Sequence, residues 1–134
     1  ENPPAPVHRQ SSRPHLAIRG YPVITMTDPP THKGSRRNLL GTDPSEEMIT
    51  KMSAEKHVTP DTPPTFLFHT TEDRSVPAQN SILFYTALLE NNVPAELHIY
   101  EKGRHGLGLA KDLPAMSAWP SQAITWLKEQ GFLE

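Results

Sequence analysis

Cysteine is absent from this chain of 134 residues, which excludes disulfides, thiol nucleophiles and thiolate metal sites together. Long apolar runs are missing too, since none approaches the roughly 20 residues that a membrane-spanning helix needs. We therefore predict no membrane span, and the opening residues show no signal-peptide pattern. An excess of positive charge is also lacking, because the formal net charge is −2. Without a basic face to follow a phosphate backbone, nucleic acid is not an expected partner.

Metal-ligand spacing is missing even though the chain has seven histidines. No two of them form H-x-x-x-H, so we predict neither a metal nor a cofactor. His69 and His98 fall in apolar runs, and we interpret both as hydrogen-bonded structural residues. Proline, by contrast, is abundant: the fifteen prolines are about twice the usual share and stand at the edges of predicted elements.

Three short apolar runs predict strands. The first lies within His15–Ile24, after a proline-rich loop over Glu1–Pro14. The second, Thr65–His69, is apolar almost throughout and is typical of a strand buried on both faces of a parallel sheet. The third, Ala95–Tyr100, alternates between apolar and polar residues. A length of 134 residues allows one domain or part of one.

Helices are predicted between and after these strands. Asp43-Pro44 predicts a helix start, with an acidic N-cap and proline at the first helical position, running toward Met52. Met26–Leu40 reads as a long polar connection, and one or two turns follow Ser53. Two longer helices are expected: one over Pro77–Asn91, with Ile82, Leu83, Tyr85, Ala87, Leu88 and Leu89 as its apolar positions and Asn92 at its end, and one from Pro120 to Gly131, with Ile124, Trp126 and Leu127 inward.

The alternation of strand and helix predicts an α/β fold with a mostly parallel sheet of about three strands and helices packed on it. In such a sheet every strand delivers its following loop to the same edge. Asp73 follows the second strand and His105 the third, so we expect the two side chains to be neighbours. A carboxylate beside an imidazole can fix the ring's tautomer and stabilise its protonated form, as nucleophilic catalysis requires.

The residues around this pair carry a family resemblance. Pro63–Thr70 followed by Asp73–Pro77 (D-R-S-V-P) resembles the D-x-x-V-P loop of α/β-hydrolases. Glu96–Gly106 resembles their last strand and histidine loop, in the branch of esterases, lipases, carbohydrate acetylesterases and dienelactone-hydrolase-like enzymes. Arg19–Ile24 and Gly34–Gly41 look like the segments that follow the nucleophile's helix there.

The resemblance implies that Asp73 and His105 are the acid and base of a Ser-His-Asp triad, and that the residues 1–134 are the C-terminal portion of one α/β-hydrolase domain. The nucleophile elbow G-x-S-x-G does not occur. Ser35 lies in the long connection and Ser75 is too close to Asp73, so we interpret both as surface or capping hydroxyls. We therefore expect the serine, with the N-terminal half of the domain, outside this chain, and no appreciable esterase activity from the chain alone.

Several alternatives stay open. Glu72 competes with Asp73 as the acid because it is adjacent. A small ester, such as an acetylated carbohydrate, is the implied substrate, but a prolyl-oligopeptidase-like serine peptidase uses similar loops. A non-catalytic fragment that self-associates through the exposed edge of the first strand is the third alternative. Trp119 is open between pocket and core, and Arg36 and Arg37 between a rim over the site and a solvated pair. We interpret Trp126 as core, and Gly103 and Gly106 as turn residues around His105.

Overall fold

The computed structural model describes residues 11–134; the loop expected over Glu1–Pro14 lies mostly outside them. Strands β1 (Ala17–Gly20), β2 (Thr65–Thr70) and β3 (Ala95–Tyr100) form a parallel sheet in the order β1-β2-β3. Three strands joined by helical crossovers are what the sequence predicts. The first strand is shorter than the apolar run that contains it.

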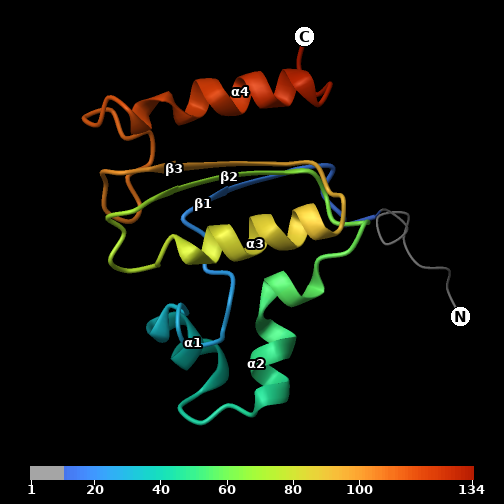
Figure 1. Cartoon of the computed structure of the whole chain (residues 1–134), viewed down its shortest axis with the longest axis vertical. Coiled ribbons are helices and arrows are strands. Elements are labelled where there is room, and N and C mark those ends of the chain that lie inside the picture. Colours follow the sequence, from blue (N-terminus) through green and yellow to red (C-terminus); the bar gives the residue numbers. More distant parts are fainter. Residues whose placement is uncertain (1–10) are drawn as a thin grey trace, which may run out of the picture.

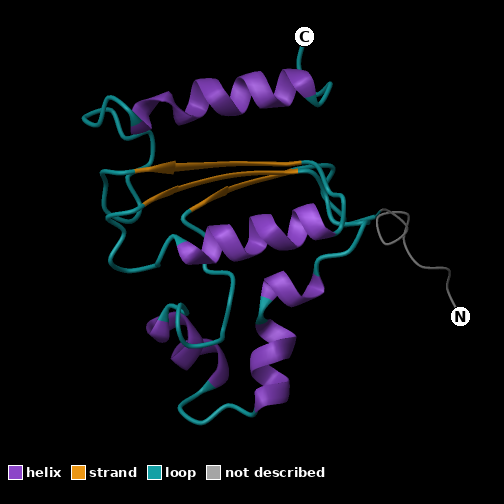
Figure 2. Cartoon of the chain, in the orientation of Figure 1, coloured by secondary structure: helices purple, strands orange, loops and turns teal. Residues whose placement is uncertain are grey.

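Helices cover both faces of the sheet. Helix α3 (Gln79–Glu90) packs on one face and α4 (Trp119–Glu129) on the other, as Figure 1 shows. The segment between β1 and β2 forms α1 (Lys33–Leu40), α2 (Glu46–Met52) and a single 3₁₀ turn, Ala54–His57, on the α3 side of the sheet. Figure 2 shows the short strands sandwiched between the two longer helices.

Strand β2 connects two apolar cores because its side chains alternate between the faces of the sheet. Phe66 and Phe68 point toward α4, and Leu67 points toward α3. All six residues of β2 are buried. The buried core residues are Tyr21, Phe66, Phe68, Ala110, Met116, Ala123 and Trp126 on the α4 side, and Ile24, Leu67, Phe84, Leu88 and Val93 on the α3 side.

The long connection predicted over Met26–Leu40 is wrong in its second half, which is α1. The side chain of His32 caps this helix by accepting a hydrogen bond from the backbone N–H of Ser35. A histidine cap is not a usual helix-start signal, and α1 has no buried residue, so the apolar pattern gave no signal either.

The helix predicted from Asp43-Pro44 begins later, at Glu46, because Ser45 is its N-cap and accepts from the N–H of Met48. The one or two turns expected after Ser53 are confirmed by the 3₁₀ turn there. Two C-terminal signals are also confirmed: Asn92 has φ 56° and Gly131 has φ 74°, the left-handed conformation that ends a helix.

The inward face of α3 differs from the predicted stripe. Ile82, Leu83 and Leu89 are exposed, while the buried residues are Asn80, Ser81, Phe84, Ala87 and Leu88. In α4, Trp126 is buried as predicted, but Ile124 is 48% exposed. Two buried polar residues at the start of α3 therefore replace expected apolar contacts, and both lie beside the loop that carries Asp73.

Candidate active site

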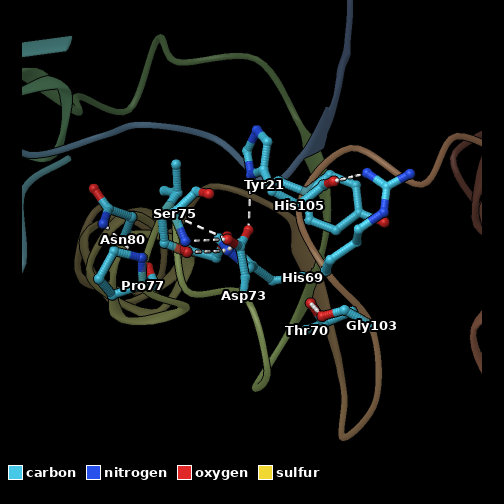
Figure 3. Close-up of polar contacts among 12 residues, drawn as sticks. Tyr21, His69, Thr70, Asp73, Ser75, Pro77, Asn80, Gly103 and His105 are labelled. Carbon is cyan, nitrogen blue, oxygen red and sulfur yellow. Dashed lines mark hydrogen bonds and ion pairs between the residues drawn. The ribbon is translucent and has the colours of Figure 1, made fainter. Parts of the chain in front are cut away.

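Asp73 and His105 meet at the carboxyl edge of the sheet. Asp73 lies three residues after β2 and His105 five residues after β3, and their loops emerge side by side because β2 and β3 are parallel neighbours. The Oδ2 atom of Asp73 lies 2.7 Å from the Nδ1 atom of His105, as Figure 3 shows. The structure thus brings together the two residues that the sequence singled out.

The carboxylate of Asp73 is held rigidly. Its side chain has no exposed surface, and its Oδ1 atom accepts hydrogen bonds from the backbone N–H groups of Ser75 and Val76, each at 2.9 Å. Burial by itself would raise the pKa of Asp73, but the Val76 amide, the His105 ring and the Ser75 amide together hold that pKa below its usual value. Asp73 is therefore an ionised acceptor at neutral pH.

The ring of His105 is oriented by that acceptor. A carboxylate at Nδ1 requires the neutral ring to carry its proton there, which leaves Nε2 with a free lone pair. The side chain is 41% exposed, and its ring packs against Tyr21 with 5.3 Å between ring centroids. Such a ring can accept a proton at Nε2 from a group outside the described residues, and it gains a stabilising carboxylate when it does so.

Glu72, the rival acid, faces another way. Its Oε1 atom lies 3.0 Å from the Nζ atom of Lys102, and its Oε2 atom accepts from the backbone N–H of Gly103 at 3.2 Å. These contacts lower the pKa of Glu72, the Lys102 hydrogen bond most of all. Glu72 thus links the two loops from the outside, and Asp73 contacts the histidine.

Neither serine considered in the sequence is presented as an elbow nucleophile. Ser35 lies in α1, where its hydroxyl is 2.8 Å from the Nδ1 atom of His32. Ser75 is in the turn that holds Asp73. It also lines an open hollow of about 330 Å³ beside the histidine, together with Glu72, Arg74, Arg104 and His105. The walls of this hollow are rich in hydrogen-bonding groups.

Gly103 and Thr70 fix the base of the histidine loop. Gly103 has φ 135°, a conformation that glycine adopts without steric cost, and a Cβ there would lie 2.9 Å from a Leu107 methyl and 3.0 Å from the Thr70 methyl. The hydroxyl of Thr70 donates to the carbonyl of Gly103 at 2.8 Å. Gly106 also has positive φ, so both glycines serve the turn around His105, as expected.

Sequence reasoning missed the part that Tyr21, Asn80 and His69 play in shaping the site. Tyr21 adopts φ 50° directly after β1, and its hydroxyl donates to the sulfur of Met116 at 3.3 Å. Asn80 is fully buried and joins the segment after β1 to the acid loop through four hydrogen bonds. His69 is buried and hydrogen-bonded, as expected of a structural histidine, but it also contacts Asp73. Topology was the available signal, because all three lie at the ends of elements on this edge.

Other residues named from the sequence lie elsewhere. Arg36 and Arg37 line a separate hollow of about 380 Å³, whose walls include neither Asp73 nor His105. Trp119 stacks on Phe68 with 4.2 Å between ring centroids, and its indole N–H donates to the carbonyl of Gly108.

Within residues 11–134, no group of three His, Asp or Glu side chains is placed to hold a metal ion. No helix in that part of the chain has the length and apolar character to cross a bilayer.

Comparison with known proteins places the chain among hydrolases. The profile of the prolyl oligopeptidase family matches residues 9–130. Endo-1,4-beta-xylanase B of Butyrivibrio fibrisolvens is 46% identical over 102 residues, which are 76% of this chain and 16% of that protein. The acetylxylan esterase of Xylanibacter ruminicola is 35% identical over 103 residues, which are 72% of this chain and 21% of that protein.

A solved structure matches along nearly the whole chain. The acetyl ester-xyloside bifunctional hydrolase from Caldicellulosiruptor lactoaceticus superimposes with a TM-score of 0.93 at 42% identity, covering 98% of this chain and 48% of that one. The chain therefore spans about half the length of this solved relative, and 16% and 21% of the two curated relatives.

Proposed function

This chain belongs to the prolyl oligopeptidase family, within the α/β-hydrolase superfamily, and from that premise we propose that it supplies the acid and base of a serine hydrolase acting on carboxylic esters. The 2.7 Å contact between Asp73 and His105 is the observation that supports this function. Asp73 holds the imidazole in place and stabilises its protonated form. The Nε2 atom of His105 takes the proton from a serine hydroxyl and returns it to the leaving alcohol.

The serine belongs, in this proposal, to a segment outside the chain. The sequence contains no G-x-S-x-G, and Ser35 and Ser75 are both engaged in local contacts. Residues 1–134 would then be the C-terminal portion of one hydrolase domain. Strand β1 pairs only with β2 among the described residues, so its other edge would accept a strand of the serine-bearing segment. The chain alone is expected to lack appreciable esterase activity.

The substrate we propose is a small ester, with an acetylated carbohydrate as the first candidate. An acetylxylan esterase and an acetyl ester-xyloside hydrolase are among the similar proteins. The hollow beside His105 is lined by charged and hydroxyl side chains, which suit an alcohol rich in hydroxyl groups better than an apolar one. A serine peptidase remains the rival, because the same acid and base would serve both reactions and the family carries the peptidase's name.

The test compares two neighbouring carboxylates in the protein that also carries the serine segment. Asp73→Asn should lower kcat/KM for p-nitrophenyl acetate by about 10⁴-fold, the size of loss seen when a triad aspartate becomes an amide. The matched variant Glu72→Gln should lose far less, about tenfold at most, since Glu72 contacts Lys102 and the wall of the hollow but not His105. Equal losses in both variants would refute the assignment of Asp73.

Three further measurements separate the alternatives. Cleavage of proline-containing peptides without cleavage of p-nitrophenyl esters would identify a peptidase. A fluorophosphonate label attached to a serine of this chain would contradict the proposal that the nucleophile lies elsewhere. Light scattering on the isolated chain tests self-association through β1, and a monomer would remove that alternative.

A further inference from the structure

A second histidine contacts the carboxylate that holds His105. His69, near the end of β2, is completely buried, and its Nε2 atom lies 3.3 Å from the Oδ2 atom of Asp73 and 2.9 Å from the carbonyl oxygen of Val76. Its other ring nitrogen, Nδ1, lies 2.7 Å from the hydroxyl of Ser81 in the first turn of α3. Figure 3 shows His69 next to Asp73.

The contacts of His69 determine its protonation. Nε2 faces two oxygen acceptors, so it must carry the proton. Nδ1 is then an acceptor, and the Ser81 hydroxyl donates to it. Burial lowers the pKa of His69, while the Val76 carbonyl and Asp73 oppose that shift more weakly. The ring is therefore neutral, and both of its nitrogens have hydrogen-bond partners.

This ring closes the turn that holds Asp73. Val76 donates its N–H to Oδ1 of Asp73, and the carbonyl of the same residue accepts from His69. The carboxylate thereby accepts three hydrogen bonds, from two backbone amides at Oδ1 and from His105 at Oδ2, and the Nε2 atom of His69 contacts Oδ2 at 3.3 Å. A positively charged side chain in the place of His69 would compete with His105 for the carboxylate, whereas a neutral donor does not.

We infer that His69, fixed by Ser81, is a positioning residue that holds the carboxylate of Asp73 against Nδ1 of His105. The inference rests on the proposed function only in taking the Asp73–His105 pair to be catalytic. The ionisable groups near the ring are Asp73, His105 and Tyr21, whose ring centroid is 5.7 Å away. The residue of α3 that contacts the ring, Ser81, is uncharged.

The test uses ¹⁵N NMR of the imidazole nitrogens in this chain, which reports the tautomer of each neutral ring. In the parent chain, His69 should carry its proton on Nε2 and His105 on Nδ1. His69→Leu removes the donor and should lower the tautomer ratio of His105 by about tenfold, the effect of one hydrogen bond of ordinary strength. His69→Gln places an amide N–H near the position of Nε2 and should restore the ratio. His57→Leu is the control, because His57 is exposed and contacts only the Thr50 carbonyl.

Two results would overturn the inference. One is a His69 ring protonated on Nδ1 in the parent chain, a measurement that holds even where His69→Leu fails to fold. The other is a folded His69→Leu chain in which His105 keeps its Nδ1–H tautomer as fully as in the parent. The measurement needs no serine, so its outcome is independent of whether the whole protein hydrolyses esters.

Discussion

Replacing Asp73 by Asn tests the site through stability. Asn keeps an oxygen for the amides of Ser75 and Val76, but it puts an NH₂ group where Oδ2 was. That group would face the Nδ1–H of His105 and the Nε2–H of His69, which lie 2.7 and 3.3 Å from Oδ2. The NH₂ group of the introduced Asn would then face two N–H donors in a site where the parent carboxylate has no exposed surface, so none of these donors would find an acceptor there.

The expected loss at pH 7 is about 3 kcal/mol. A hydrogen bond to a charged group contributes about 1.5–3 kcal/mol; the variant loses the one from His105 and also the favourable contact with His69. The His69 contact is the longer and weaker one. His105 is 41% exposed and can turn to another tautomer, which recovers part of the loss. His69 cannot, because its Nε2–H is held by the Val76 carbonyl.

The loss should also depend on pH. The folded-state pKa of Asp73 lies below its ordinary value, so the carboxylate stabilises the fold fully above the unfolded pKa of about 3.9. That stabilisation is lost as the pH falls through the lower folded pKa, because between the two pKa values the unfolded chain binds more protons than the folded one and acid therefore favours unfolding. The difference between parent and variant should therefore shrink below about pH 4.

Urea unfolding followed by circular dichroism measures both effects. With a slope of about 1.5 kcal/mol per M for a chain of this size, the midpoint should fall by about 2 M at pH 7. Asp112→Asn is the matched control, since Asp112 is exposed. A loss below about 0.5 kcal/mol at pH 7, or a loss that persists unchanged at pH 3, would refute the reasoning.

Three other substitutions probe the scaffold of the site, all by urea unfolding. Asn80→Asp puts an oxygen against two carbonyls and should cost about 3 kcal/mol; a loss below about 1 kcal/mol would contradict the four-bond role. Gly103→Ala should cost about 2–3 kcal/mol, because its Cβ meets Leu107 at 2.9 Å and its φ is 135°, whereas Gly41→Ala, with open space around it, should cost less. Phe66→Ala empties a fully buried position and should cost about 3–5 kcal/mol; a smaller loss would mean that the α4 core can collapse around the gap.

Local patterns predicted the elements that have strong one-dimensional signals. The mostly apolar run Thr65–His69 predicted β2, whose two faces are both covered, and Asn92 and Gly131 mark helix ends through their conformational freedom. α1 escaped prediction because its cap is the histidine side chain of His32 and its residues are not buried. A helix without an apolar face leaves no periodic trace in the sequence.

The sequence was enough to predict the contact between Asp73 and His105, but not the hydrogen-bonded residues around them. Topology alone put Asp73 and His105 at one edge, and the motif resemblance named them. Asn80 and Ser81 were hidden because polar residues at the start of an amphipathic helix read as its solvent side. Both are instead buried against the acid loop, where hydrogen bonds replace apolar packing. Which face of a helix turns inward near a polar site depends on those partners, and a hydrophobic pattern does not record them.

The register of β2 and β3 determines how far apart the acid loop and the histidine loop lie. The last pair aligned along the strands is Thr70 with Tyr100. Asp73 follows Thr70 by three residues, and His105 follows Tyr100 by five. A slip of one residue would displace one loop by about 3.3 Å and turn each side chain of the strand to the opposite face. That displacement exceeds the 2.7 Å contact itself. The burial of all six β2 residues therefore fixes the alignment on which proton transfer would depend.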